Sequence, residues 1–389
     1  MDVAREAKEP CLTVVMPVYN GERHLRETLE RFTQIKYNEI ELLLIDDGSA
    51  DASGAICGEY EALDGRIRCI RQSNQGIAAS RNRGLELARG EYICFWDQDD
   101  ILIPEGYFRL LHKVQGAQAQ IGMCSTGRMI KGKMSDYESL RGGDYAGEEV
   151  RRQLLYPLLF RGYRYSFADD DNYLYGSVWK CIFRTDFVRD NRIRFRRFVN
   201  YEDDWIFVTQ ALCFADKAVT VSDTGYCWRV NEESESHRGT YIEDLPDKFD
   251  VLDRFVLAYL SRGIKNKKII AEYNNVIMCE HYIDLYRNAA NMHNTAYIRT
   301  AQVTDSGAND RKKCRRQIRE YLHRTDYRRR IACRKYLKSS AYRRRIILGS
   351  LRYGGIGFAY MISRIYDRLE DAMSRIQWIV RLERQRKMK

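Results

Sequence analysis

The first 125 residues alternate short apolar runs with amphipathic stretches, and this alternation limits the possible folds more than any other feature. The apolar runs have the length of buried strands and occur at 12–16, 41–45, 66–70, 92–96 and 120–124. The segments between them have helical features and occur at 22–34, 52–62, 78–88 and 104–114. Strands that alternate with helices predict an α/β fold with a mainly parallel sheet and helices on both faces.

The remaining chain is organised differently. Residues 126–175 have no regular pattern and predict an irregular segment, after which apolar order returns at 178–187 and 206–214. Beyond residue 241 the pattern is helical and charged. A chain of 389 residues is long enough for two domains. We therefore predict an α/β domain at 1–240 and a helical region at 241–389.

Composition excludes several classes of protein. With 44% hydrophobic and 31% charged residues, the chain can fold as a globule. Its 11 cysteines are scattered without a C-x-x-C pair, which argues against a disulfide framework or zinc site and favours a reducing, cytoplasmic compartment. We find no signal segment at the N-terminus and no apolar stretch of 18 residues, so no spanning helix is expected.

Three carboxylates follow the apolar run 92–96, namely Asp97, Asp99 and Asp100. Carboxylates so close together repel one another unless a cation lies among them. The spacing Asp97-x-Asp99 suits a divalent ion with oxygen ligands and open positions for a diphosphate. The alternative is a solvated acidic loop with no function.

Two earlier segments also end apolar runs. In the segment Pro17-Val18-Tyr19-Asn20-Gly21, Tyr19 could stack on a nucleobase, or Asn20 could simply cap the next helix. Asp47 could bind a base or ribose, or could belong to an Asp-Gly turn. A G-x-G-x-x-G fingerprint is absent here, which argues against nicotinamide or flavin binding.

The segment 74–84 begins with Asn74 and opens a helix. Its Arg81 or Arg83 could line a diphosphate, or could pair with acidic neighbours. Gly84 is expected to permit close helix packing. A further match, Gly127-x4-Gly132-Lys133, resembles a phosphate-binding loop, but Met134 follows where Ser or Thr should hold magnesium, so we interpret it as chance.

Acidic residues also open a later helix. Glu202, Asp203 and Asp204 precede an apolar helical pattern, where acidic residues are common because of the helix dipole. A carboxylate there could instead act as a general base on an acceptor hydroxyl. His237 lies in a Ser-rich loop and could ligate a metal, or could be solvated.

Taken together and in order, these segments resemble family two glycosyltransferases with the GT-A fold. The resemblance covers roughly residues 11–240, and the segments that carry it are 14–21, 46–49, 74–84, 90–100, 179–184, 202–204 and 226–229. It implies transfer of a sugar from a nucleotide-diphosphate donor with inversion at the anomeric carbon. A UDP-sugar is favoured as the donor, and Mn²⁺ or Mg²⁺ is implied as the cofactor.

The resemblance also implies roles for individual residues. Asp97 and Asp99 match the D-x-D motif, with Asp99 favoured as the direct metal ligand and Asp100 as support. Pro17, Tyr19, Asn20, Asp47, Asn74 and Arg81 match the donor side, where Tyr19 and Asp47 would hold a uracil. Asp203 matches the catalytic base with Glu202 beside it, although the base could be one residue on, at Asp204. Gln98 departs from the pattern, because Ser, Ala or Asp is common there.

The charge of the chain is concentrated at its C-terminal end. Residues 311–389 contain 25 Lys and Arg against 6 Asp and Glu, a net charge of +19, and subtracting this from the chain's +11 leaves −8. Basic clusters beside aromatic and aliphatic residues predict helices that lie on an anionic membrane surface. The alternative is a solvated helical tail used for self-association. Nucleic acid is not expected as a partner, because no RNA- or DNA-binding motif occurs.

These patterns suggest an enzyme on the cytoplasmic face of the cell membrane that extends a glycan or lipid-linked acceptor in polysaccharide synthesis. Two alternatives are open. A sugar nucleotidyltransferase would carry a Gly-rich basic loop after the first strand, where this chain has Pro17 to Asn20. A catalytically silent nucleotide-sugar-binding scaffold would be expected to lack Asp99 or Asp203. The oligomeric state is not encoded in any pattern that we find.

Overall fold

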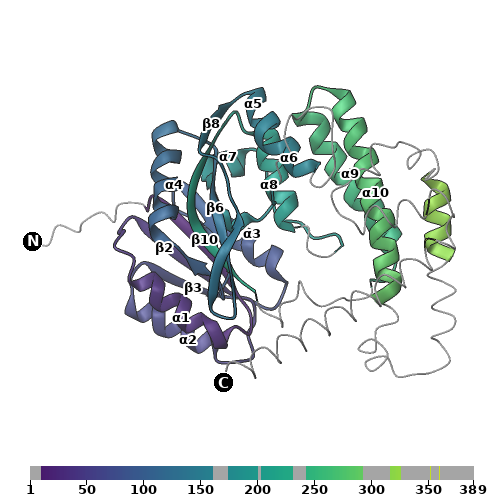
Figure 1. Ribbon diagram of the computed structural model, residues 1–389. Helices are drawn as coiled ribbons and strands as arrows, with labels where there is room; N and C mark the ends of the chain where they lie inside the picture. The colour runs from purple at the N-terminus through teal and green to yellow at the C-terminus, as the bar shows by residue number, and fades with distance from the viewer. Residues whose placement is uncertain are drawn as a thin grey trace, which may run out of the picture. The chain divides into compact units, whose positions relative to one another are not determined.

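The computed structural model describes residues 10–160, 174–199, 203–230, 242–291 and 316–325, together with residues 351 and 359 (Figure 1). The chain forms two compact units. The first comprises Met1–Leu159 and Asn172–Ser234, and the second comprises Phe160–Asp171 and Glu235–Lys389. The boundary predicted at residue 240 falls outside the described residues and stays a prediction.

Ten strands of the described chain form one sheet in the first unit. The hydrogen-bonded order is β3-β2-β1-β4-β9-β6-β10-β5, with β7 paired to β6 and β8 paired to β10. The strands are β1 (Leu12–Val18), β2 (Ile40–Asp46), β3 (Ile67–Arg71), β4 (Tyr92–Phe95), β5 (Ile101–Leu102), β6 (Ile121–Ile130), β7 (Lys133–Glu138), β8 (Gly143–Ala146), β9 (Cys181–Arg184) and β10 (Lys217–Arg229).

Helices connect these strands as the alternating pattern predicts. They are α1 (Glu22–Thr33), α2 (Ser53–Leu63), α3 (Ile77–Leu87), α4 (Pro104–Ala117), α5 (Glu148–Val150), α6 (Tyr156–Leu159), α7 (Thr185–Asp190) and α8 (Asp203–Phe214). A π-helical turn at Arg151–Leu155 joins α5 to α6, and a 3-10 turn at Val178–Lys180 precedes β9.

The α/β prediction is confirmed, and the sheet is mixed. Strands β3, β2, β1 and β4 are parallel neighbours. Strand β9 is antiparallel to both β4 and β6, whereas β10 runs parallel to β6. The parallel half is built from β-α-β units, which require a helical crossover between neighbouring strands. Its carboxyl ends therefore share one edge of the sheet.

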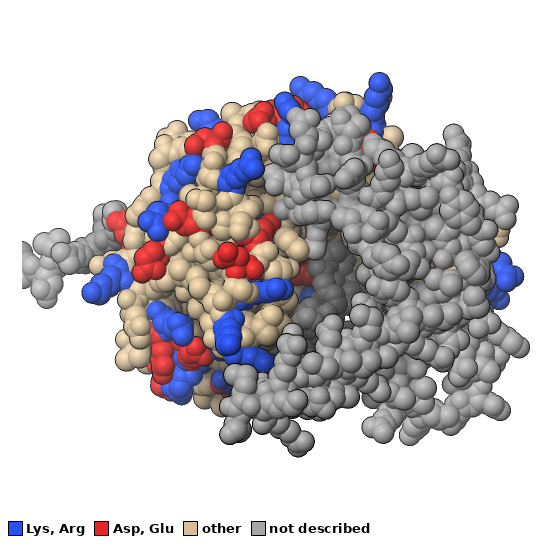
Figure 2. Space-filling model, viewed as in Figure 1, with Lys and Arg blue, Asp and Glu red and all other residues tan. Residues whose placement is uncertain are grey.

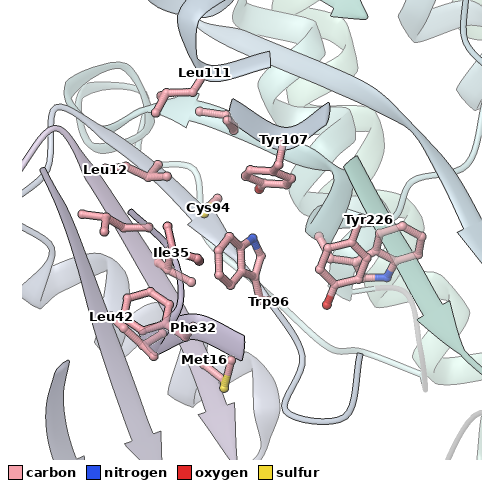
Figure 3. Packing of buried hydrophobic residues seen from close by; sticks show 14 of the residues in the cluster. Leu12, Met16, Phe32, Ile35, Leu42, Cys94, Trp96, Tyr107, Leu111 and Tyr226 are labelled. Atoms are coloured by element: carbon pink, nitrogen blue, oxygen red, sulfur yellow. The ribbon is translucent and has the colours of Figure 1, made fainter. Parts of the chain in front are cut away.

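One face of the sheet packs against α1, α2 and α4 (Figure 3). Residues Leu12, Met16 and Leu42 point into this layer and are fully buried. Trp96 lies between the ring of Phe32, at a centroid distance of 6.5 Å, and the ring of Tyr107, at 5.4 Å. Edge-on aromatic contacts of this kind add to the free energy gained by burial. The residue directly before the acidic motif is therefore held in the core.

The opposite face of the sheet packs against α3 and α8. A Cβ atom at Gly84 would lie 2.2 Å from Val15 Cγ1, so glycine lets α3 approach β1 closely. This confirms the prediction that Gly84 permits close helix packing. Phe207 of α8 stacks on Phe195 at 4.1 Å and meets the ring of Phe95 edge-on at 5.4 Å. These rings connect β4, α8 and the segment before α8.

The prediction that residues 126–175 are irregular is wrong for their described part. Strand β6 continues to Ile130 and forms an antiparallel hairpin with β7. Lys131 and Gly132 form the turn with φ angles of 49° and 76°, as a two-residue hairpin of type I′ requires. The phosphate-loop-like match at 127–133 thus lies in a hairpin, in agreement with its interpretation as chance. Strand β7 is largely exposed, so it lacks the apolar alternation that marks a half-buried strand.

The second unit is helical where it is described. It contains α9 (Leu245–Gly263), α10 (Lys267–Asn291) and a helical segment at 316–324. Arg324 Nη2 lies 2.9 Å from Asp250 Oδ2 of α9, and the hydroxyls of Tyr282 and Thr325 are 3.0 Å apart. Residues 316–325 therefore pack on both long helices.

Among the described residues, no helix is long and apolar enough to cross a membrane. On the face of the first unit shown in Figure 2, acidic and basic side chains are interspersed rather than gathered by sign. Most of the basic segment 311–389 lies outside the described residues, so its predicted membrane contact stays a prediction.

Candidate active site

The carboxyl ends of β1, β2 and β4 lie side by side because these strands are parallel neighbours. In open α/β sheets, ligands bind at such an edge. Tyr19, Asp47 and Asp97 follow the three strands within two residues. The structure thus brings together three residues that the sequence placed in one site.

The loops after β1 and β2 are tied to each other. The Asn20 N–H donates to Ser49 Oγ at 3.1 Å, and Asn20 Oδ1 accepts from the Ala50 N–H at 2.9 Å. Asn20 has a φ of 45°, a conformation that Asn adopts more readily than most residues. Pro17 lies within β1, so the strand runs past its predicted end. Tyr19 is left with 49% of its surface exposed.

Asp47 shapes the loop that precedes α3. Its carboxylate is buried and accepts hydrogen bonds from the Gln72 side chain at 2.8 Å, the Gln75 N–H at 2.9 Å and the Gly76 N–H at 2.8 Å. Asn74 lies in the same loop and is exposed. In this structure, Asp47 therefore fixes the loop that carries another predicted donor-side residue.

Gln98 fastens the acidic loop to the end of β1. Its side chain accepts from the Tyr19 N–H and donates to the Tyr19 carbonyl, both at 3.1 Å. Its own carbonyl accepts from the Thr28 hydroxyl at 2.9 Å. Gln98, which departs from the family pattern, thus joins the two loops by a pair of side-chain hydrogen bonds. A Ser or Ala could not form this pair because its side chain is too short.

The acidic loop brings its carboxyl groups close together in a partly buried place. Burial, together with the charge of Asp97, raises the pKa of Asp99 to about 6. Burial also raises the pKa of Asp100 well above its usual range, and the charges of Asp97 and Asp99 add to this effect. Both shifts disfavour the charged forms of these carboxyl groups, first because the groups are buried and second because like charges lie close by.

Strand β10 supports this loop from behind. The Arg229 N–H donates to Asp100 Oδ1 at 2.8 Å, and Arg229 Nε donates to the Asp99 carbonyl, also at 2.8 Å. The buried hydroxyl of Tyr226 accepts from the Asp97 N–H at 2.9 Å. Arg229 therefore contacts the acidic loop through both its backbone and its side chain.

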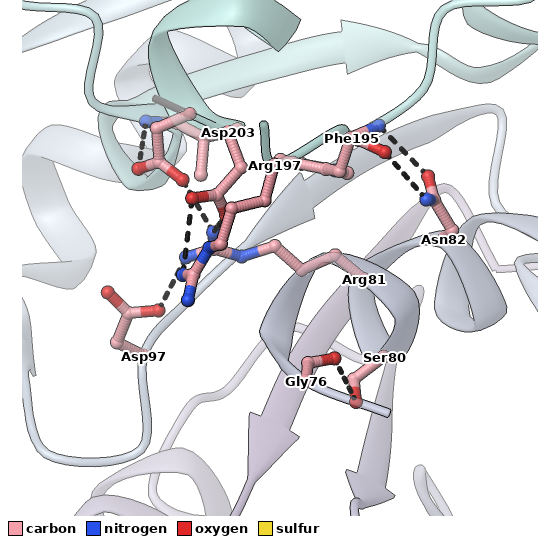
Figure 4. A network of polar contacts seen from close by, with 10 residues as sticks. Gly76, Ser80, Arg81, Asn82, Asp97, Phe195, Arg197 and Asp203 are labelled. Atoms are coloured by element: carbon pink, nitrogen blue, oxygen red, sulfur yellow. Dashed lines mark hydrogen bonds and ion pairs between the residues drawn. The ribbon is translucent and has the colours of Figure 1, made fainter. Parts of the chain in front are cut away.

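Arg81 joins two groups of carboxylates (Figure 4). Its Nη2 donates to Asp97 Oδ1 at 2.9 Å, and its Nη1 donates to Asp203 Oδ2 at 3.0 Å and also to Asp204 Oδ1. Only 3% of the Arg81 surface is exposed. Of the two interpretations of Arg81 from the sequence, the contacts match pairing with acidic neighbours.

Asp203 and Asp204 begin α8 and have different surroundings. Asp203 is 5% exposed at its side chain and also contacts Arg197 Nη2, at 3.3 Å from Oδ1. The Asp204 side chain is 24% exposed, and its Oδ2 accepts from the Val178 N–H at 3.2 Å. The first turn of a helix favours negative charge, which helps both carboxylates.

Burial and opposite charges act against each other in this group. Burial raises the pKa of Asp204 to about 7, although the Arg81 guanidinium opposes the shift. Burial alone would lower the pKa of Arg81, but the charges of Asp204, Asp97 and Asp203 raise it above its ordinary value. Arg81 therefore stays charged, and its single positive charge is shared by three carboxylates.

The composition of the site fits a divalent cation. No group of three His, Cys, Asp or Glu is arranged as a metal cage in the part of the chain that the structure describes. A magnesium-like ion on a diphosphate needs only one or two carboxylates, with phosphate and water oxygens completing its shell. Three aspartates of the site, Asp97, Asp203 and Asp204, pair with the guanidinium groups of Arg81 and Arg197, whereas the Arg229 guanidinium pairs with Glu27. With Asp99 and Asp100 beside them, carboxylates outnumber arginines in the described part of the site.

Two predicted site residues, Glu202 and His237, lie outside the described residues. Two residues that the sequence did not single out are Arg197, which contacts Asp203, and Tyr226, which supports Asp97. Arg197 stands in an arginine-rich segment without a distinguishing spacing. Tyr226 belongs to the Tyr-x-Trp-Arg segment, which could have suggested it.

The chain is similar to known glycosyltransferases. Residues 13–187 match the model of Glycosyl transferase family 2. EpsH of Bacillus subtilis, named as a glycosyltransferase, is 29% identical over 227 residues, which cover 58% of this chain and 62% of EpsH. EpsJ of the same organism is 24% identical, with coverages of 80% and 84%. The succinoglycan biosynthesis protein ExoO of Rhizobium meliloti is 26% identical, with coverages of 67% and 72%.

Solved structures give the same fold. TarS of S. aureus, residues 1–349 in complex with UDP-GlcNAc, superposes with a TM-score of 0.60 at 18% identity, covering 92% of this chain and 91% of that one. The chain is therefore similar to family 2 of the glycosyltransferases over residues 13–187, and it has the GT-A fold that the sequence predicted.

Proposed function

We propose that this chain is an inverting glycosyltransferase that moves a sugar from a nucleotide-diphosphate donor, a UDP-sugar, to a hydroxyl of a glycan or lipid-linked acceptor. The observation that carries the proposal is the division of the aspartates into two groups at one sheet edge, Asp97 to Asp100 after β4 and Asp203 with Asp204 on α8. Sugar transfer needs two such groups. One holds the cation that neutralises the leaving diphosphate, and the other takes the proton from the attacking hydroxyl.

The donor side lies at the carboxyl ends of β1, β2 and β4. Tyr19 offers an exposed ring on which a base can stack, and Asp47 lies beside it at the end of β2. TarS, which shares the fold, was solved with UDP-GlcNAc and with UDP. These observations support a uridine nucleotide as the donor.

Asp97 and Asp99 would hold Mn²⁺ or Mg²⁺ on the diphosphate, with Asp100 behind them. A divalent ion in this place neutralises the charge that gathers on a leaving diphosphate. The raised pKa of Asp99 and the excess of carboxylates over arginines in the described part of the site both favour a cation here. Arg229 and Gln98 hold the loop in place.

Asp203 would be the general base. A carboxylate within hydrogen-bond reach of an acceptor hydroxyl contributes roughly 10²–10⁴ in rate. Each carboxylate oxygen has two acceptor sites, so Asp203 can bind Arg81 and Arg197 and still accept a proton. Asp204 is the alternative because it is the more exposed of the two. Comparison of D203N with D204N decides between them: the variant of the base loses transfer, and the other variant retains most of it.

The acceptor is proposed to be part of a cell-surface polysaccharide, which the name of ExoO supports. The basic segment 311–389 would hold the enzyme on the cytoplasmic face of the membrane. Deletion of residues 311–389 should abolish co-sedimentation with anionic vesicles. It should not change co-sedimentation with neutral vesicles. Unchanged co-sedimentation would contradict this part of the proposal.

The proposed activity is tested by nucleotide release from UDP-, GDP-, dTDP- and CDP-sugars, with Mn²⁺, Mg²⁺ or EDTA. We expect release from UDP-sugars alone, dependent on the metal and lost in D99A. A preference for another nucleotide would overturn the assignment of uridine. If no donor reacts, binding of UDP with Mn²⁺ distinguishes an enzyme that requires its acceptor from a silent fold.

A further inference from the structure

Arg81 is fixed in place by a second set of contacts. The neighbouring Asn82 donates to the Phe195 carbonyl at 2.9 Å and accepts from the Phe195 N–H at 3.0 Å. The Phe195 ring lies 5.3 Å from the Arg81 guanidinium carbon and stacks on Phe207 of α8 at 4.1 Å. The position of α3, which carries Arg81, is thereby linked to that of α8, which carries Asp203 (Figure 4).

The two terminal nitrogens of the Arg81 guanidinium bind the two groups of aspartates separately. Nη2 binds Asp97, which follows β4, and Nη1 binds Asp203 and Asp204 at the start of α8. A guanidinium is planar and presents its donors in a fixed fork, so it sets the relative placement of its partners. A lysine ammonium is a point charge on a flexible stem and would neutralise charge without fixing that geometry.

The burial of this group argues against a role in stability alone. A buried ion pair loses so much hydration that apolar residues of similar volume often stabilise a protein as well or better. Arg81 is 3% exposed, and Asp203 is 5% exposed at its side chain. A buried cation shared by three carboxylates is costly, and it is more readily explained by the need for a fixed arrangement of those carboxylates.

We propose that Arg81 is a positioning residue. It holds the proton-accepting carboxylate of Asp203 in a fixed position relative to the donor-side carboxylate of Asp97. This inference rests on the proposed function. It assigns Arg81 to the arrangement between the two groups of aspartates, and not to contact with the donor diphosphate that the sequence also allowed. Arg197 contacts the other oxygen of the same carboxylate.

The proposal is tested with R81K and R81Q in the full chain. R26Q is the matched control, because Arg26 lies on α1, has a side chain that is 47% exposed, and pairs with Glu59 of α2 on the surface. For each variant we would measure the melting temperature, the Kd of UDP in the presence of Mn²⁺, and kcat and KM for the acceptor.

Misplacement of a reacting group by about 1 Å can cost roughly 10²-fold in rate. We therefore expect both variants of Arg81 to lose about 10²-fold in kcat, with the Kd of UDP changed by no more than a few-fold. R26Q should match the wild type.

Loss of UDP binding with kcat retained would overturn the proposal and make Arg81 a donor-binding residue. A wild-type kcat in folded R81Q would also overturn it. If R81Q does not fold, R81K and R197Q test the same point, and a wild-type kcat in both contradicts it. If the wild type transfers no sugar, the proposed function has failed. In that case a double-mutant cycle on the free energy of unfolding still measures the coupling between Arg81 and Asp203.

Discussion

Arg81 Nη1 donates a hydrogen bond of 3.0 Å to Asp203 Oδ2, although 122 residues separate the two in the chain. The contact connects a helix of the parallel half of the sheet with a helix that follows the antiparallel strand β9. Because Arg81 also binds Asp97, the fold determines how far apart the two groups of aspartates lie.

Removal of the exposed aromatic ring at the end of β1 should weaken nucleotide binding. Tyr19 is 49% exposed, so its ring is available for stacking. Stacking of a base on an aromatic side chain contributes about 1–3 kcal/mol. Y19A should therefore raise the Kd of UDP by a factor of roughly 5–150, whereas Y19F should bind as the wild type does. Calorimetric titration measures both, and equal affinity of Y19A and Y19F would exclude stacking.

The buried ion pair between Lys180 and Glu138 should couple strongly in stability. Lys180 is fully buried, the Glu138 side chain is 3% exposed, and Glu138 Oε1 also accepts from the Tyr175 N–H at 2.8 Å. Removal of one partner leaves an unpaired buried charge, at a cost of about 3–5 kcal/mol. K180M should lose that much in the free energy of unfolding, and K180M/E138Q should be more stable than K180M. Additive losses in denaturant titrations would show that the two side chains are not coupled.

The helical unit should lose stability in acid because of His281. This side chain is 2% exposed, stacks on Phe249 at 3.7 Å, and its Nδ1 faces the Tyr321 hydroxyl at 2.9 Å and Asp253 Oδ2 at 3.6 Å. Burial lowers the pKa of His281 from 6.5 to about 3. The unfolded chain therefore takes up the proton first as the pH falls.

The stability due to neutral His281 is complete above pH 6.5 and is lost as the pH falls toward 3. A single group of this kind gives a slope of about 1.4 kcal/mol per pH unit at most. H281F keeps a ring at this position and should flatten the fall of unfolding free energy between pH 6.5 and pH 4. An unaltered slope in H281F would mean that another group titrates.

The parallel half of the fold could be predicted because its strands are continuous apolar runs. Strands β1 and β2 are buried almost throughout, and the helices between them end in polar turns, so periodicity identifies each element. The hairpin β6–β7 was missed for the opposite reason. Strand β7 is exposed, so it has no apolar alternation. Its turn depends on positive φ angles at Lys131 and Gly132, and a Lys-Gly pair is not a typical sequence for such a turn.

The site was only partly predictable. Asp97, Asp99 and Asp203 belong to motifs with fixed spacing, which sequence reasoning can find. The roles of Arg81 and Arg197 depend on which loops the fold brings together, so the sequence left Arg81 with two interpretations and did not mark Arg197. Gln98 could be noted as a departure from the family pattern. Its hydrogen bonds to the Tyr19 backbone depend on the fold, which places the two loops next to each other.

The central claim is that the two groups of aspartates have separate tasks. It is tested most directly by calorimetric titration of UDP with Mn²⁺ into the wild type, D99A and D203N, combined with an assay of sugar transfer. We predict that D203N binds UDP with wild-type affinity and loses transfer by roughly 10²–10⁴-fold, whereas D99A loses metal-dependent binding. Near wild-type transfer by D203N, or equal loss of binding in both variants, would contradict the account.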